Sequence, residues 1–269
     1  MRPPERSPRR CSLAGALFLL SLASCATPAG DGHFDEEDLE TLAYLPIVDG
    51  QVRATEGRPV PYEAEVRALW DELRRRLPAS TLGALAQVRG IRVVDGEDAP
   101  PGAAGPVHDD PRGPWEILLG RDALEDDEDF LWTVVHEYGH VLSLGDRGIT
   151  LREDVPHLVP SGPRFGEFHE RYWERTGLFE ALLEINPEAS FDPRIEGRFI
   201  DYVQRESGRA HEFVSEFAMV SPEEDFTETF AAYVLGDAPE GNGPVGGGGR
   251  EKLAWFAETY PKAEAEPGD

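Results

Sequence analysis

Apolar residues recur every three to four positions in two segments of the chain, which is the spacing of a helix with a buried face. The first segment runs from Tyr62 to Leu77. The second runs from Phe130 to Leu144 and ends before Gly145, a residue that often follows the last turn of a helix. We therefore expect one helix in each segment.

Two short apolar runs, residues 90–94 and 115–119, have the composition of β-strands. Further along, Ser221 followed by Pro222 is typical of a helix N-terminus, with Ser as the N-cap, and this helix should extend to about Leu235. The pattern favours an α+β fold. We expect a small twisted sheet packed on the second of the two early helices, followed by a mainly helical C-terminal half.

The N-terminus differs in composition from the rest of the chain. Basic residues up to Arg10 precede the apolar run 13–23, the order of a secretion signal. The run ends in Leu-Ala-Ser-Cys at 22–25, which resembles the signal of bacterial lipoproteins. The resemblance implies a signal peptide over residues 1–24, removed before Cys25, and a lipid attached to that cysteine. An ordinary signal peptide with an incidental cysteine is the alternative.

Residues 25–60 are rich in Ala, Pro, Gly and acidic side chains, so we expect a flexible tether, with 41–48 as a short docked segment. Residues 61–262 should then form the folded domain and residues 263–269 a disordered tail. The lipoprotein resemblance implies an exported protein held to a membrane by its lipid. Ala26 after the cysteine favours the outer membrane if the cell is Gram-negative.

The charge and the cysteines narrow the possible partners and metal ligands. The chain has 52 acidic and 26 basic residues, a net charge of −26. Nucleic acid is excluded as a partner because its binders use Lys and Arg to displace counterions from phosphates. The two cysteines are Cys11 and Cys25. Removal of the signal peptide would remove Cys11, and acylation would use the thiol of Cys25. A metal site must therefore use His and carboxylate ligands.

The sequence HEYGH at residues 136–140 is an HExxH motif inside the expected helix 130–144. Residues four apart lie one above the other on a helix, so His136 and His140 can bind one metal ion, and two imidazoles suit Zn²⁺. Glu137 lies one residue further round the helix than His136. From there it can take a proton from a metal-bound water that attacks a carbonyl. Gly139 costs the helix about 1 kcal/mol relative to Ala, but it would let a neighbouring element approach.

A zinc site of this class needs a third protein ligand. The metzincin motif would place Gly at 143 and His at 146, where this chain has Ser143 and Asp146, so that class is excluded. The best candidates are Glu224 and Glu228, four residues apart on one face of the helix that begins near Ser221. One carboxylate would bind the metal, and the other would hold a ligand histidine by its free ring N–H.

HEYGH followed by a helix with EDFTE at 224–228 resembles the Glu-zincin metallopeptidases typified by anthrax lethal factor. It resembles still more the bacterial lipoproteins described as zinc-binding metallopeptidases. The resemblance implies that Glu224 is the third zinc ligand, that Glu228 supports a ligand histidine and that Glu137 is the general base for cleavage of a peptide or protein substrate. The opposite assignment of Glu224 and Glu228 stays open.

One position departs from the family pattern. The lethal-factor-like enzymes have a Tyr seven residues before the ligand Glu, where this chain has Phe217. A hydroxyl or imidazole for the oxyanion would have to come from Tyr202, Tyr233 or His211. Two hypotheses follow: a lipid-anchored zinc metallopeptidase, or a catalytically weak or inactive zinc-binding lipoprotein that serves as a binding module. Zinc-dependent hydrolysis of amides other than peptide bonds would use the same chemistry.

Overall fold

The computed structural model describes most of the chain from residue 39 to residue 262. The described ranges are 39–53, 60–96, 99–107, 113–125, 127–145, 149–152, 155–160, 162–187, 193–236 and 249–262. The expected signal peptide, Cys25 and the tail 263–269 lie outside these ranges. Within them, no helix has both the length and the apolar character needed to cross a bilayer.

The N-terminal half is built on a five-stranded mixed sheet in the order β2-β1-β3-β5-β4. Its strands are β1 (Glu40–Val48), β2 (Gln51–Val52), β3 (Val88–Asp95), β4 (Gly102–Pro106) and β5 (Trp115–Gly120). β3 and β5 are parallel, and the other neighbouring pairs are antiparallel. β6 (Ile149–Arg152) and β7 (Val155–Pro160) form a separate hairpin.

The C-terminal half is mainly helical. The α-helices of the described residues are α2 (Glu63–Arg76), α3 (Asp127–Leu144), α4 (Phe165–His169), α5 (Leu178–Ile185), α6 (Pro193–Asp201), α7 (Pro222–Leu235) and α8 (Gly249–Thr259). Short helical turns occupy η2 (Leu82–Gln87), η3 (Asp122–Glu125), η4 (Glu170–Glu174), η5 (Tyr202–Glu206), η6 (Ala210–Glu212) and η7 (Phe217–Met219). The sheet and these helices confirm the expected α+β fold.

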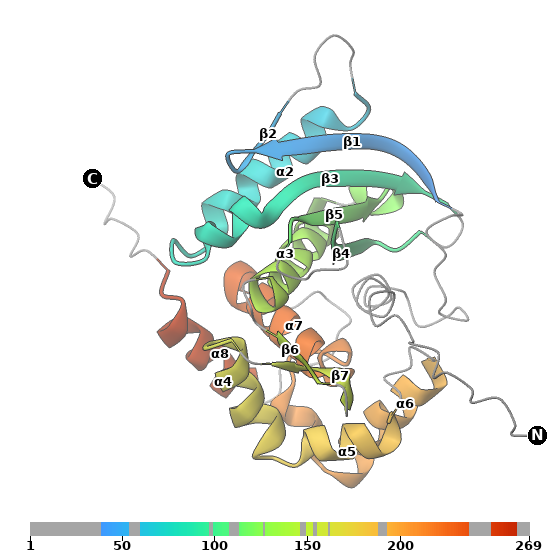
Figure 1. Cartoon of the computed structure of the whole chain (residues 1–269), viewed down its shortest axis with the longest axis vertical. Helices are drawn as coiled ribbons and strands as arrows, with labels where there is room; N and C mark the ends of the chain where they lie inside the picture. Colours follow the sequence, from blue (N-terminus) through green and yellow to red (C-terminus); the bar gives the residue numbers. More distant parts are fainter. Residues whose placement is uncertain are drawn as a thin grey trace, which may run out of the picture.

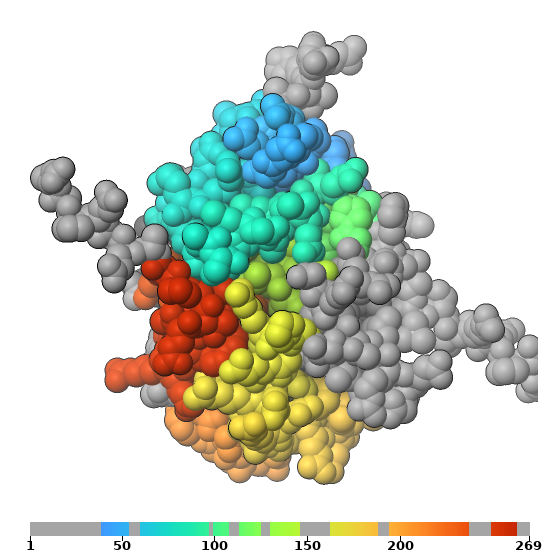
Figure 2. Space-filling view, turned by 60° about the vertical axis from the view of Figure 1, so that its left-hand side comes forward, coloured from blue at the N-terminus to red at the C-terminus, as the bar shows by residue number. Residues whose placement is uncertain are grey.

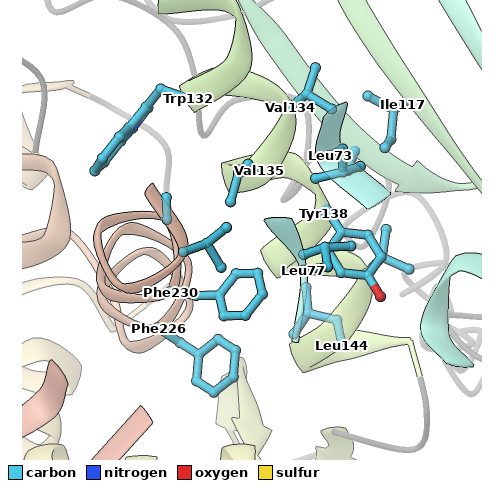
Figure 3. Close-up of a cluster of buried hydrophobic side chains, with 14 of the residues drawn as sticks. Leu73, Leu77, Ile117, Trp132, Val134, Val135, Tyr138, Leu144, Phe226 and Phe230 are labelled. Carbon is cyan, nitrogen blue, oxygen red and sulfur yellow. The ribbon is translucent and has the colours of Figure 1, made fainter. Parts of the chain in front are cut away.

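Helix α3 lies between the two halves, with the sheet on one side and α7 on the other (Figure 1). Val134 is directed toward Ile117 of β5 and Leu73 of α2, whereas Val135 lies on the side of α7 (Figure 3). Tyr138 and Phe230 of α7 bring their ring centroids to 6.3 Å. Apolar contacts on both sides therefore bury the helix that carries the HExxH motif.

The space-filling view shows the two halves in direct contact on one face of the molecule (Figure 2). The sheet and α2, in blue and teal, lie above α4 and α8, in yellow and red. α8 also packs on α7.

One prediction about the N-terminal half was wrong. The tether was expected to reach residue 60, but β1 pairs with β3 along its length, so residues 40–48 belong to the folded domain. Leu45 and Ile47 alternate with more exposed residues and are buried, a strand pattern that the acidic, Pro-rich composition of 25–60 as a whole conceals. The docked segment at 41–48 was therefore correct, as an integral strand.

Strand β4 lies in a Gly-, Ala- and Pro-rich stretch that the sequence pattern does not mark as a strand. Such residues have low strand propensity, and β4 forms because it pairs with β5 along its whole length. Its small residues also allow close approach to α3, since a Cβ at Gly102 would lie 2.3 Å from Cγ2 of Thr133. Packing against the helix, rather than local preference, specifies this strand.

Candidate metal centre

Helices α3 and α7 bring three of the predicted site residues together. His136 Nε2 lies 3.2 Å from Glu224 Oε2, and His140 Nε2 lies 3.5 Å from Glu224 Oε1. One ligand atom from each residue lies within 4.8 Å of the other two, and all three side chains are buried. The two imidazole centroids are 5.0 Å apart, as expected for residues four apart on one helix face. The group could hold a metal ion.

Gly139 allows the two helices to cross this closely. A Cβ on Gly139 would lie 3.0 Å from Cβ of Thr227 and 3.1 Å from its Cα, so a larger residue would meet the backbone of α7. Thr227 is one turn beyond Glu224 on α7. The predicted use of a small residue in the motif helix is therefore confirmed.

The start of α7 is fixed by local capping. Ser221 is the N-cap, its side chain accepts a hydrogen bond from the Glu224 amide at 3.2 Å, and Pro222 occupies the first turn, as predicted. Gly236 ends the helix with φ of 98°. Because the cap bonds the backbone of Glu224 itself, it helps to hold this residue at the first turn.

A buried ion pair anchors a second face of α7. Lys252 Nζ of α8 donates to Asp225 Oδ2 at 2.6 Å, and Trp173 Nε1 donates to the same oxygen at 2.9 Å. Thr229 Oγ1 donates to Asp225 Oδ1 at 3.3 Å. Lys252 Nζ also lies 3.8 Å from the ring centroid of Phe213. Since Asp225 follows Glu224, these bonds restrain the rotation of α7 about its axis.

Glu228 lies against the other nitrogen of His136. Its Oε1 is 2.8 Å from His136 Nδ1 and accepts a hydrogen bond from Trp132 Nε1 at 3.3 Å. Its Oε2 accepts from Ser215 Oγ at 2.6 Å. The geometry thus separates the two carboxylates, with Glu224 on the Nε2 side and Glu228 on the Nδ1 side. This favours Glu224 as the third ligand. The roles of Glu224 as a metal ligand and of Glu228 as the support of His136 stay predictions.

Glu137 is fully buried and lies beside β4. A Cβ on Gly102 would come within 3.0 Å of Glu137 Oε1, so the absence of a side chain at that position leaves room for the carboxylate. Glu137 is not a member of the three-residue group that could hold the metal. This placement is compatible with a base that acts beside the metal rather than as a ligand.

The electrostatics of the group suit a cation. Burial lowers the pKa of His140 well below its ordinary value, and the charge of His136 lowers it further, so His140 is neutral, the form that binds metals. Burial raises the pKa of Glu224. For Glu228, burial also acts to raise the pKa, but the hydrogen bond and charge of His136 and the bonds from Ser215 and Trp132 outweigh it and lower the pKa.

Several buried polar atoms of the group lack hydrogen bonds. Among the described residues, the two ring nitrogens of His140 have no hydrogen-bond partner, and neither does Oε2 of Glu224. Leaving such atoms unsatisfied costs about 1–3 kcal/mol each. A divalent cation between His136, His140 and Glu224 would use one ring nitrogen of His140 and Oε2 of Glu224, so the residues present fit a metal ion.

The structure also locates the residues considered for the oxyanion. The Phe217 ring lies 5.8 Å from the His136 ring, so this position faces the site with an apolar side chain. Tyr233 donates its hydroxyl to the Tyr260 carbonyl at 2.6 Å, and Tyr202 stacks on Phe199. His211 is exposed, with Nδ1 3.0 Å from the Gly208 carbonyl oxygen. These three side chains make their contacts away from the metal ligands.

Two residues that contact Glu228 were missed by the sequence reasoning. Trp132 precedes His136 by one helical turn, and this spacing could have indicated it. Ser215 has no such signal, because only the tertiary fold brings it to Glu228.

Comparison with models of protein families, with curated proteins and with solved structures found no match to this chain.

Proposed function

We propose that the protein is a zinc-dependent metallopeptidase. The observation that carries the proposal is the buried group His136, His140 and Glu224, with Glu228 behind His136. Two histidines, one glutamate and an open position form the ligand set of catalytic zinc sites, whereas structural sites use four protein ligands. A bound zinc ion would lower the pKa of a coordinated water and polarise the carbonyl under attack.

The chain's own residues would supply the remaining chemistry. Glu137, buried beside β4, would accept the proton of the attacking water and later return it to the leaving amine. His136 and His140 would stay neutral and hold the metal from one face of α3, while α7 carries Glu224 to the same point. The ligand side chains and Glu137 are buried, which strengthens electrostatic interactions among them. The choice of peptide bonds comes from the family resemblance.

A second candidate function is a binding module that holds zinc without turnover. Phe217 supports it, since this residue faces His136 and has no hydroxyl to donate to an oxyanion. Removing one oxyanion donor from an enzyme typically costs about 10²–10³ in kcat. We favour the peptidase because Glu137 is present beside the metal ligands, and a zinc-binding module would have no use for a base at that position.

We further propose that the protein is exported and anchored by a lipid on Cys25. The N-terminal signal pattern supports this, and the net charge of −26 makes electrostatic adhesion to anionic lipid unfavourable. The outer membrane is the proposed location in a Gram-negative cell. Labelling with a radioactive fatty acid tests the anchor: the wild-type chain should take up label, and Cys25→Ala should not. Equal labelling of the two would contradict it.

Zinc content and hydrolysis of a peptide library test the proposed activity in the purified full-length chain. We expect one zinc per chain and turnover that Glu137→Gln abolishes without loss of zinc. Glu116→Gln, on β5 in an ion pair with Arg92, is the control and should keep both properties. A zinc-free wild type refutes both candidate functions. Turnover that persists in Glu137→Gln refutes the mechanism, and zinc binding with no turnover favours the binding module.

A further inference from the structure

The Glu228 carboxylate receives hydrogen bonds on both oxygens from different parts of the chain. Oε1 meets His136 Nδ1 at 2.8 Å and Trp132 Nε1 at 3.3 Å, both from α3. Oε2 meets Ser215 Oγ at 2.6 Å, from the segment before η7. All four side chains are buried. We call Trp132, Ser215 and Glu228 the Glu228 clamp.

The donors of the clamp determine which nitrogen of His136 carries a proton. An ionised carboxylate only accepts hydrogen bonds, and an indole N–H only donates them. With Glu228 held as the acceptor, His136 must donate from Nδ1. In the neutral ring, which is the form that binds a metal, Nε2 then carries the lone pair, and this is the atom 3.2 Å from Glu224 Oε2. The ring is therefore set in the tautomer that can bind a metal together with Glu224.

Ser215 has a second hydrogen bond that orients its hydroxyl. Its Oγ accepts from the Ala218 amide at 3.0 Å, so the single hydroxyl hydrogen is free to point at Glu228. This bond also fixes η7, which carries Phe217 beside the His136 ring. One buried serine thus links the orientation of Glu228 to the segment that carries Phe217.

We propose that Ser215 and Trp132 are positioning residues for the metal centre, acting on His136 through Glu228. The inference rests on the proposed function for its zinc-binding consequence, but the tautomer of His136 is a property of the metal-free chain as well. Outer residues that orient a metal ligand typically contribute about 10–100-fold to metal affinity. The clamp should therefore raise zinc affinity without contacting the ion.

The first test measures zinc affinity of the full-length chain by competition with a chelator. We expect Ser215→Ala to weaken binding about tenfold, and Trp132→Phe to weaken it less because its bond is longer. Ser143→Ala is the matched control: Ser143 is also buried near the site but bonds only the His140 carbonyl, at 3.3 Å. It should leave the affinity unchanged. Wild-type affinity in Ser215→Ala would overturn the proposal.

A double-mutant cycle separates positioning from a general structural effect. If Ser215 acts through Glu228, Ser215→Ala should cause no further loss of zinc affinity when Glu228 is already replaced by Met. Equal losses in both backgrounds would show that Ser215 acts independently, against the proposal. Thermal unfolding of each variant identifies those that fail to fold.

The second test reads the His136 tautomer by ¹⁵N NMR in the metal-free chain, with the signal assigned from its loss in His136→Asn. We expect a proton on Nδ1 in the wild type and a shift toward the other tautomer in Ser215→Ala. A wild-type proton on Nε2 would overturn the clamp. A chain that binds no zinc yet shows the expected tautomer would refute the proposed function and leave the clamp standing.

Discussion

Replacing Gly139 with Ala would place a methyl group between the two helices that carry the metal ligands. The new Cβ would lie 3.0 Å from Cβ and Cγ2 of Thr227 and 3.1 Å from its Cα, whereas ordinary contacts begin at 3.4 Å. Because a backbone atom is among these neighbours, a change of rotamer cannot relieve the overlap. Helix α7 must therefore retreat by about 0.4 Å, the difference between these distances.

The displacement should affect zinc binding more than folding. Ala gains about 1 kcal/mol over Gly in helix propensity, and overpacking costs about 1–3 kcal/mol, so the net loss of unfolding free energy is roughly 0–2 kcal/mol. Glu224 is one turn before Thr227 and would move with α7, whereas metal–ligand distances tolerate only about 0.2 Å. We expect zinc affinity to fall at least about tenfold, which is the loss typically caused by mutation of a residue that orients a metal ligand.

The assay combines chelator competition for zinc with chemical denaturation of the metal-free chain. Gly197→Ala is the matched control, because Gly197 is an exposed residue of α6 with nothing within 4 Å of its added Cβ. That variant should gain roughly 0.5–1 kcal/mol of stability with unchanged zinc affinity. If Gly139→Ala also bound zinc as tightly as the wild type, the reasoning about helix approach would be refuted.

Three further changes have defined outcomes. Phe217→Tyr adds a hydroxyl beside His136 and should raise kcat at least about tenfold with unchanged zinc affinity; unchanged kcat in steady-state assays would contradict this. Lys252→Met leaves Asp225 buried without its cation and should lower the unfolding free energy by about 3–5 kcal/mol in chemical denaturation, with recovery when Asp225→Asn is added. Burial lowers the pKa of His169 to about 4, from 6.5, so the folded chain keeps it neutral while the unfolded chain takes up a proton. Stability should therefore fall by roughly 3 kcal/mol more between pH 6.5 and 4 in the wild type than in His169→Leu, and parallel pH curves would contradict this.

The features that could be predicted from sequence depend on residues close together in the chain. The HExxH spacing places His136 and His140 on one helix face, and Ser221 with Pro222 marks the start of α7 to the residue. Glu224 and Glu228 could be selected as a pair from their spacing. Their separate roles could not, because only the crossing of α3 and α7 shows which nitrogen of His136 each carboxylate approaches.

The features that escaped prediction depend on tertiary contacts. β4 consists of Gly, Ala and Pro and becomes a strand through pairing with β5 and close packing on α3. β1 was concealed by the average composition of the segment around it. Ser215 reaches Glu228 from a short turn with no periodic pattern. The lipid anchor at Cys25 lies outside the described residues and stays a prediction.

A crystal structure of the zinc-loaded chain, with the metal located by anomalous scattering at the zinc edge, tests the central claim most directly. We predict one zinc ion bound by Nε2 of His136, Nε2 of His140 and a carboxylate oxygen of Glu224. The two nitrogens should lie at about 2.0–2.1 Å, with Glu228 still on His136 Nδ1. A structure with no zinc at this point, or with zinc bound through Glu228 instead of Glu224, would contradict the account.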